Sequence, residues 1–308
     1  MHLNSSISSS RAGYIGTLFV TAALVVLAGA AVVILAKHVG RETIPNQALL
    51  DHQFGKIGRG TPPDIIFVGD SSLGNAIDSA EWSSLSGMSA LNLALSGSYG
   101  YEGSYNMIRR VIDWRAPRHV VIMQTGEMMQ RQPSEEAYIM TAPGLLGRVV
   151  AYWRMTMSAQ QVENATLWLL STMRRGKPPP FRESFIVNDY ILQGPKRTRN
   201  PNTEGWSPRS VRADKAEYLN EIGRLCAEYA IDCIYVHGPL TEPVCGKSEA
   251  YFAEVAKVVQ AAGIRLAQVM PPCVPEGEIG DGKDHVRPDL KVAYTRKYYD
   301  MIAPQLRR

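Results

Sequence analysis

The chain has 308 residues, of which 45% are apolar and 20% are charged, a balance typical of a folded globular protein rather than a disordered one. The formal net charge of +4 is small, and no basic stripe with interleaved aromatic residues occurs, so we expect no nucleic acid partner. The first element along the chain is an uncharged apolar run over residues 14–36, which is long enough to cross a bilayer. We interpret this run as an uncleaved transmembrane anchor that follows a short N-terminus, residues 1–13.

Two features of the anchor leave alternatives open. A cleavable signal peptide is the competing interpretation, because Ala28-Gly29-Ala30 has a small-x-small pattern, although signal peptides have apolar regions of about 7–15 residues. A strict count of the flanking positive charges, Arg11 before the run and Lys37, His38 and Arg41 after it, places the C-terminal side in the cytoplasm. The difference in charge is small, and we expect the opposite orientation. The globular part then lies on the periplasmic or extracellular side of the cytoplasmic membrane, and residues 1–13 are cytoplasmic.

The rest of the chain alternates between short apolar runs and helical patterns. Residues 37–63 are polar and bear Gly and Pro, so we expect a tether there and a globular domain over 64–308. The pattern predicts strands at 64–68, 89–97, 119–126, 231–239 and 264–270, and helices at 79–86, 103–115, 213–230, 251–263 and 288–304. Such alternation predicts an α/β fold, a three-layer sandwich around a parallel sheet that presents functional groups at the carboxyl ends of its strands.

One stretch, residues 131–212, has no place in this alternation. It contains helical patches, a basic Pro-rich segment and two aromatic residues, Tyr190 and Trp206, that would suit stacking on sugars. We interpret it as an inserted cap, and a loosely packed surface insertion is the alternative.

The four cysteines, Cys226, Cys233, Cys245 and Cys273, all lie in the last third of the chain. An even number in a compact region suits two disulfides in an oxidising compartment, and four free buried thiols are the alternative. Cys245 and Cys273 each follow a predicted strand at the same sheet edge, so we predict that they are bonded to each other. No pair has C-x-x-C spacing and no histidine lies near at ligand spacing, so we expect neither a metal site nor a cofactor.

The first predicted strand ends at Gly69-Asp70-Ser71-Ser72, where a parallel sheet places its chemistry. A serine at the start of the following helix suits a nucleophile whose oxyanion meets backbone N–H groups. The alternative is that Asp70 and Ser71 only cap that helix.

Three blocks in order, each at a predicted strand or loop end, are similar to those of the SGNH/GDSL hydrolase superfamily. They are Gly69–Ser71, the Asn-x-x-x-Ser-Gly run over Asn92–Gly97, and a C-terminal histidine, His285, that precedes a closing helix. The resemblance spans residues 64–130 and 216–304, and it implies a flavodoxin-like α/β sandwich. It places the nucleophile on Ser71, the general base on His285, and the backbone donors of the oxyanion hole on Ser71 and Gly97.

The chain departs from the family pattern at two positions. The third block normally supplies an asparagine amide to the oxyanion hole, but an ungapped match places Glu127 there, and an ionised carboxylate cannot donate. The family also has an aspartate three residues before its histidine, where this chain has Gly282. We expect Asp281 to orient His285, with Asp284 as the alternative. Further candidates for substrate binding are Asp70, Ser72 and His237, although His237 also fits a packed loop histidine.

The resemblance implies a membrane-anchored serine esterase or O-acyltransferase that acts on cell-envelope polysaccharide through an acyl-enzyme, with a Ser-His-Asp triad. A single N-terminal anchor joined to such a domain resembles the exported acetylation proteins of alginate and cellulose systems, which work beside a membrane-bound O-acyltransferase. Such an enzyme is therefore the expected partner. The alternative is a catalytically impaired polysaccharide-binding or assembly subunit, with Glu127 as the sign of lost activity.

Overall fold

The computed structural model describes residues 13–24, 27–28, 45–144, 174 and 203–306. The chain divides into two compact units, residues 1–44 with 152–181 and residues 45–151 with 182–308. In the first unit, residues 13–24 and 27–28 are helical, and their apolar side chains, such as Leu18 and Phe19, are exposed. No helix within the described residues is both long and apolar enough to cross a membrane. Residues 25–26 and 29–36 of the expected anchor lie outside the described residues, as does most of the expected cap, including Tyr190.

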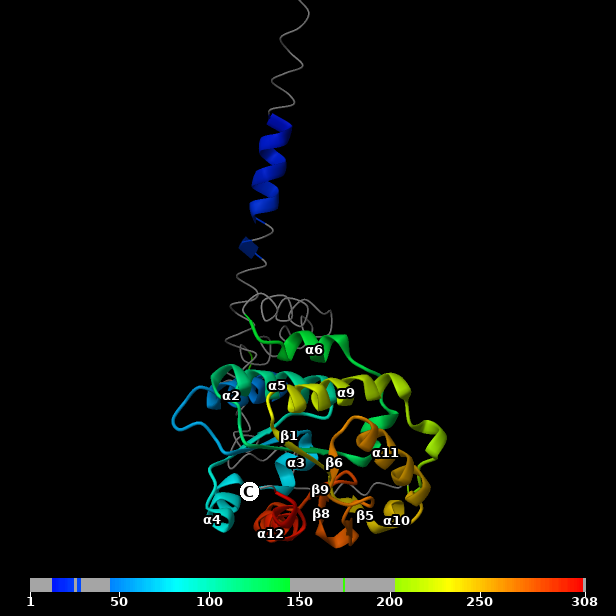
Figure 1. Ribbon diagram of the computed structural model, residues 1–308. Helices are drawn as coiled ribbons and strands as arrows, with labels where there is room; N and C mark the ends of the chain where they lie inside the picture. The colour runs from blue at the N-terminus through cyan, green and yellow to red at the C-terminus, as the bar shows by residue number, and fades with distance from the viewer. Residues whose placement is uncertain (1–12, 25–26, 29–44, 145–173, 175–202, 307–308) are drawn as a thin grey trace, which may run out of the picture. The chain divides into compact units, whose positions relative to one another are not determined.

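The second unit is an α/β fold around a five-stranded parallel sheet (Figure 1). The strand order is β2-β1-β3-β4-β6, which is the flavodoxin-like order 2-1-3-4-5. Every residue of β1 and β3 is buried, as expected of strands that helices cover on both faces. The strands are β1 (Ile65–Gly69), β2 (Ala90–Ala94), β3 (His119–Gln124), β4 (Asp232–His237) and β6 (Arg265–Leu266).

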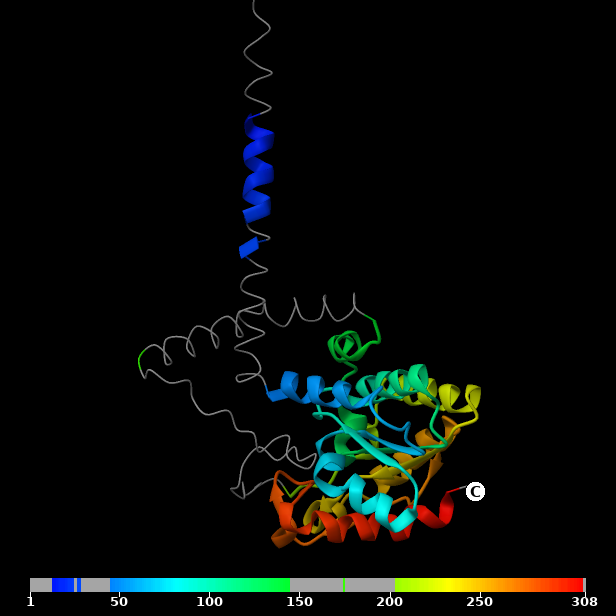
Figure 2. The ribbon, with the colours of Figure 1, turned by 90° about the vertical axis from the view of Figure 1, so that its left-hand side faces the viewer.

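Helices cover both faces of this sheet (Figure 2). Contacts with the strands and with one another place α5, α9 and α11 in one layer, and α3, α4 and α12 in the other. The core of the second layer joins Phe67 and Val121 of the sheet to Trp82 of α4 and Tyr298 of α12. The helices are α3 (Ser71–Ala76), α4 (Ser79–Ser86), α5 (Gly100–Trp114), α6 (Glu135–Thr141), α9 (Ala213–Glu228), α10 (Glu242–Cys245), α11 (Glu249–Ala261) and α12 (Lys291–Ile302).

The sequence predicted most of these elements to within a few residues. The strand predicted at 264–270 is shorter than expected, because only Arg265 and Leu266 pair with β4. Short 3-10 helices, which the pattern of apolar residues did not indicate, fill three connections: η1 (Gly126–Gln130), η4 (Pro208–Ser210) and η5 (Glu276–Glu278). Two more, η6 (Pro288–Leu290) and η7 (Ala303–Gln305), flank α12 at the ends of the helix predicted at 288–304.

Part of the expected tether is folded onto the domain. Residues Pro45–Lys56 form helix α2, which lies against the outer side of β2, the edge strand of the sheet. Gln53 Nε2 donates to the carbonyl of Ala94 at 2.6 Å, and Lys56 Nζ donates to that of Asn92 at 2.9 Å. An open sheet edge exposes unpaired backbone groups, and these two side chains satisfy carbonyls of that edge. The polar residues that suggested a solvated tether therefore bind the sheet.

Two small pairs of strands lie beyond the carboxyl ends of the main sheet. β5 (Leu240–Thr241) runs parallel to β7 (Cys273–Val274), and β8 (Ile279–Asp281) pairs with β9 (His285–Val286) in an antiparallel hairpin. Thr241 N–H donates to the carbonyl of Lys283 in the hairpin turn at 2.9 Å, which joins the two pairs. Disulfides connect Cys245 to Cys273 and Cys226 to Cys233. The Cys245–Cys273 bond joins α10 to β7, and β7 pairs with β5, the strand whose Thr241 contacts the hairpin turn.

Candidate active site

The serine lies where β1 ends and α3 begins. Gly69, the last residue of β1, has no room for a side chain, because a Cβ there would overlap the carbonyl oxygen of Met123 on β3. Asp70 then caps α3, accepting from the backbone N–H of Ser72 at 3.0 Å. Ser71 is the first residue of that helix, so its N–H has no partner within the helix. Each residue of Gly-Asp-Ser therefore has its own role. Gly69 lets β1 and β3 approach closely, Asp70 caps α3, and Ser71 follows as a half-buried serine.

The histidine that contacts this serine comes from the hairpin near the other end of the chain. His285 Nε2 lies 2.8 Å from Ser71 Oγ, across a sequence separation of 214 residues. On the other side of the ring, Nδ1 hydrogen-bonds to the Asp281 carboxylate. Serine, histidine and aspartate thus form a continuous chain of hydrogen bonds, as in a Ser-His-Asp triad. Of the two acids left open by the sequence, Asp281 is the one that contacts Nδ1.

The position of Asp281 explains one departure from the family pattern. Asp281 and His285 face each other across the β8–β9 hairpin as registered partners. Gly282 begins the turn between them with a φ of 64°, in the left-handed region that favours glycine. The residue three before the histidine is therefore used for the turn, and the acid comes from the opposite strand.

Asp284 also lies at the site, on the side of the serine. Its Oδ1 is 3.8 Å from His285 Nε2. Burial alone lowers the pKa of His285, but Asp284, Asp281 and Asp70 together raise that pKa to about 9. At neutral pH the imidazole of the resting site is therefore largely protonated, and it must lose that proton before it can act as a base.

Asp70 and Ser72, which the sequence placed among the substrate-binding candidates, hydrogen-bond to each other inside the serine turn. Both are buried, and Asp70 accepts from Ser72 Oγ at 2.6 Å and from the N–H of Thr125 at 2.8 Å. Burial raises the pKa of Asp70 to about 6, and the nearby charge of Asp284 adds to the rise. Asp70 thus ties the end of β3 to the serine turn, and the substrate contact expected of these two residues stays a prediction.

His237 is likewise not at the surface. It ends β4, is completely buried, and packs edge-on against Tyr235 and Phe252. Burial lowers the pKa of His237 to about 3, so the ring is neutral. This position fits the alternative of a packed histidine. Trp206 also packs edge-on against Phe252, as well as against Tyr251.

Glu127 forms ion pairs with two basic side chains. It lies in η1, just after β3, and its carboxylate pairs with Arg131 one helical turn later and with Lys283 of the hairpin turn at 3.9 Å. Arg131 Nη1 in turn donates to the carbonyl of Gly97 at 2.9 Å. Sequence reasoning missed Arg131, although its i,i+4 spacing from Glu127 was a signal for an ion pair.

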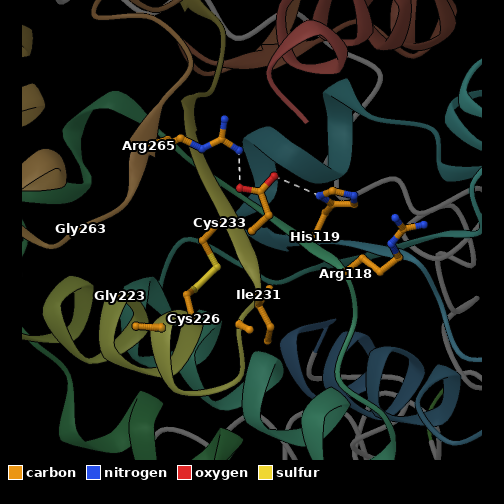
Figure 3. A pocket seen from close by; sticks show the side chains of 11 residues that line it. Arg118, His119, Gly223, Cys226, Ile231, Cys233, Gly263 and Arg265 are labelled. Atoms are coloured by element: carbon orange, nitrogen blue, oxygen red, sulfur yellow. Dashed lines mark hydrogen bonds and ion pairs between the residues drawn. A yellow bond between two sulfur atoms is a disulfide. The ribbon is translucent and has the colours of Figure 1, made fainter. Parts of the chain in front are cut away.

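A pocket of about 520 Å³ lies at the opposite edge of the sheet, where β3, β4 and β6 begin (Figure 3). Asp232 bridges His119, at 3.2 Å, and Arg265 there, and the Cys226–Cys233 disulfide lies in its wall. No group of three or more His, Cys, Asp or Glu side chains in the described ranges could hold a metal ion.

No model of a protein family matches the chain, and no curated protein matches its sequence.

Proposed function

We propose that this chain is a membrane-anchored serine esterase or O-acyltransferase that acts on cell-envelope polysaccharide. The observation that carries the proposal is the 2.8 Å distance between Ser71 Oγ and His285 Nε2, with Asp281 on the far nitrogen of the ring. These residues come from distant parts of the chain, and the fold places them at the carboxyl edge of a parallel sheet, where such folds carry their chemistry. The similarity of the strand-end motifs to SGNH/GDSL hydrolases supports the same reaction class.

The mechanism begins with neutral His285. Ser71 Oγ attacks the ester carbonyl carbon while its proton passes to His285 Nε2, and the electron pair of the carbonyl moves to oxygen. Collapse of this tetrahedral intermediate breaks the bond to the leaving alcohol, which takes the proton from Nε2 and leaves an acyl group on Ser71. Asp281 holds the imidazole with Nδ1–H toward the carboxylate, and so keeps Nε2 available. Water or a sugar hydroxyl then accepts the acyl group by the reverse sequence.

The placement in the membrane is part of the same proposal. In the described part of the N-terminal helix, Leu18, Phe19 and Leu24 are 55–73% exposed, as expected of side chains that face lipid. The hydroxyls of Thr17 and Thr21 donate to backbone carbonyls four residues earlier, so both are satisfied within the helix. A C-terminal alkaline phosphatase fusion should be active if the domain is exported. Activity of a cytoplasmic reporter in the same position instead would contradict this placement.

The decisive experiment compares the full chain with Ser71→Ala on p-nitrophenyl acetate. We expect a burst of p-nitrophenol in the parent protein and none in Ser71→Ala. Ser98→Ala, at an exposed serine in the loop after β2, is the matched control and should keep the burst. Identical traces from parent and Ser71→Ala would favour the second candidate, a polysaccharide-binding subunit. The observation that favours this second candidate is Glu127, whose carboxylate takes the position where the resemblance expects an asparagine donor.

A further inference from the structure

The site lacks a side-chain donor where the resemblance expects one. Attack of Ser71 places negative charge on the carbonyl oxygen, and removal of one donor to that charge typically slows catalysis about 10²–10³-fold. Glu127 cannot replace an asparagine amide, because its carboxylate accepts hydrogen bonds and already pairs with Arg131 and Lys283. If the site is active, another group must supply the donor.

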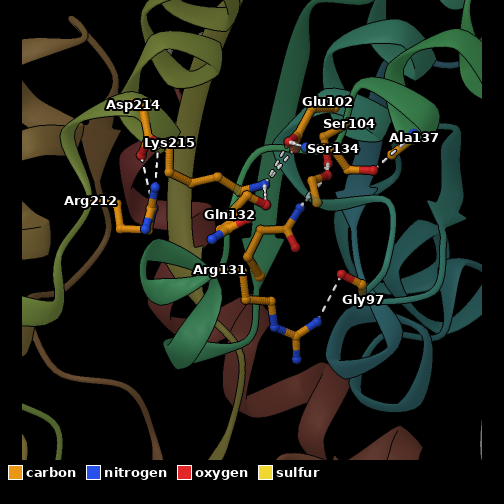
Figure 4. A network of polar contacts seen from close by, with 12 residues as sticks. Gly97, Glu102, Ser104, Arg131, Gln132, Ser134, Ala137, Arg212, Asp214 and Lys215 are labelled. Carbon is orange, nitrogen blue, oxygen red and sulfur yellow. Dashed lines mark hydrogen bonds and ion pairs between the residues drawn. The ribbon is translucent and has the colours of Figure 1, made fainter.

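Arg131 lies directly against the backbone that borders the site. Its Nη1 donates to the Gly97 carbonyl at 2.9 Å, and a Cβ on Gly97 would come within 2.8 Å of the same nitrogen (Figure 4). The family's oxyanion glycine corresponds to Gly97. The contacts to Gly97 and Glu127 engage two of the five N–H donors of a guanidinium.

The Arg131 guanidinium interacts electrostatically with carboxylates of the serine turn and of the hairpin. Burial lowers the pKa of Arg131, but Glu127 raises it, and Asp70 and Asp284 raise it further, so the net pKa is above the usual value. Asp70 caps the helix that begins at Ser71, and Asp284 lies beside His285 Nε2. The geometry agrees, because Leu95 N–H donates to the carbonyl of Gly69 at 2.8 Å, so the loop that carries Gly97 begins beside the serine turn. Glu127 also joins Arg131 to Lys283, in the turn that precedes His285.

The backbone after Arg131 is held by a buried ion pair. Lys215 of α9 binds both carboxylate oxygens of Glu102 of α5 at 2.7 Å, and both side chains are at most 2% exposed. Glu102 also accepts from the N–H of Ser134 at 2.6 Å, and Lys215 donates to the carbonyl of Gln132 at 3.4 Å (Figure 4). These contacts fix the chain on the C-terminal side of Arg131, and η1 fixes it on the other side.

We propose that Arg131 is a catalytic residue that donates to the oxyanion formed when Ser71 attacks an acyl carbonyl, in place of the asparagine amide of related sites. This inference rests on the proposed function, because it needs Ser71 to be a nucleophile. Glu127 then has a positioning role, since it holds the guanidinium beside Gly97 and balances its charge between turnovers.

The test follows covalent labelling of Ser71 in the full chain, in detergent, by an alkyl fluorophosphonate. Ser71 Oγ bonds to phosphorus, fluoride leaves, the serine proton passes to His285, and the phosphoryl oxygen occupies the oxyanion position. Mass spectrometry gives the labelling rate for the parent protein and for Arg131→Ala, Arg131→Lys and Arg212→Ala. Arg212 is the matched control, because its guanidinium pairs with the neighbouring half-exposed Asp214.

We expect Arg131→Ala to label about 10²–10³-fold more slowly than the parent, Arg131→Lys to recover part of the loss, and Arg212→Ala to match the parent. Guanidinium chloride at millimolar concentration should accelerate labelling of Arg131→Ala and leave Arg212→Ala unchanged. A merely structural arginine would not show this rescue.

Two results would overturn the inference while leaving the proposed function standing. The first is labelling of Arg131→Ala at the parental rate. The second is a loss of rate that neither lysine nor guanidinium restores, which assigns Arg131 to loop structure alone. If the parent itself labels no faster than Ser71→Ala, the proposed function fails, and the role of Arg131 fails with it.

Discussion

Each edge of the sheet carries a histidine–aspartate pair, and the two pairs differ in what surrounds them. At the amino edge, His119 and Asp232 begin neighbouring strands, and Asp232 also binds Arg265. At the carboxyl edge, the hairpin pair of His285 and Asp281 faces a serine and a second carboxylate, Asp284. One aspartate shared by a histidine and an arginine is a stabilising arrangement. One histidine among several carboxylates, within reach of a hydroxyl, is an arrangement for moving a proton.

The comparison teaches that the contact alone does not identify a catalytic pair. Both pairs are largely buried, and both place a carboxylate on a histidine Nδ1. Within the described residues, only the pair at the carboxyl edge has its other ring nitrogen, Nε2 of His285, at 2.8 Å from a half-buried serine. The pair of His119 and Asp232 at the amino edge can therefore serve as a control in experiments on the site.

The largest expected difference is in activity. Asp281→Asn should slow acylation by p-nitrophenyl acetate about 10⁴-fold, because an amide at this position favours the wrong imidazole tautomer. Asp232→Asn makes the same chemical change at the amino edge and should leave the rate per folded molecule unchanged. An equal loss in both variants would show that the effect comes from folding and not from the triad.

The disulfides give the next largest effect. Cys245–Cys273 closes 28 residues beside the hairpin, and Cys226–Cys233 closes 7 residues at the amino-edge pocket. By the chain-entropy model the longer loop contributes about 3.5 kcal/mol to the free energy of unfolding, and the shorter one about 2.5 kcal/mol. Double serine variants of each pair, unfolded in guanidinium chloride, should therefore differ by about 1 kcal/mol. A larger loss from the Cys226 pair would contradict the expected order.

The pH dependence tests the carboxylates around His285. The raised pKa of about 9 means that kcat/KM should rise with pH toward a plateau above 9. At pH 7 the rate should be about 100-fold below that plateau, because the ring is protonated two pH units below its pKa. Asp284→Asn removes one of the carboxylates that raise this pKa, so the rise should move to lower pH and the variant should exceed the parent at pH 7.

Asp289→Asn, at an exposed acid on the same part of the chain, is the control for that shift and should keep the parental profile.

The raised pKa of His285 also predicts a change in the stability of the fold with pH. His285 binds its proton more tightly in the folded chain than in the unfolded one, where the pKa is about 6.5. Its stabilising contribution is therefore full below pH 6.5 and is lost as pH rises through 9. An activity profile that is flat between pH 7 and 9 would contradict the raised pKa of His285.

The smallest expected effect is the stability contribution of the amino-edge pair. Asp232→Asn should lower the free energy of unfolding by about 1–3 kcal/mol, because His119 and Arg265 each lose a charged partner. Urea unfolding measures this change, with Asp113→Asn at an exposed position as the control. No loss of stability in Asp232→Asn would indicate that Arg265 finds another acceptor, and the contrast between the two edges would weaken.

Local patterns in the sequence determined the parallel α/β architecture and singled out Ser71 and His285, which the structure brings together. The alternation of apolar runs and helical spacing is set by neighbouring residues, so it predicted most strands and helices to within a few positions. The Gly-Asp-Ser turn is also local, because the close strand approach at Gly69 and the cap at Asp70 follow from three consecutive residues.

The tertiary structure decided what depends on contacts between distant residues. Gln53 and Lys56 look like solvated tether residues, yet they bind the edge strand across about forty positions of sequence. Asp281 rather than Asp284 contacts His285 Nδ1 because a hairpin sets them opposite each other. His237 is buried and Arg131 lies on Gly97 because the packing of β4, and of η1 on the loop after β2, fixes them there. Burial and long-range charge carry no local signature, so no pattern of neighbouring residues could have assigned these roles.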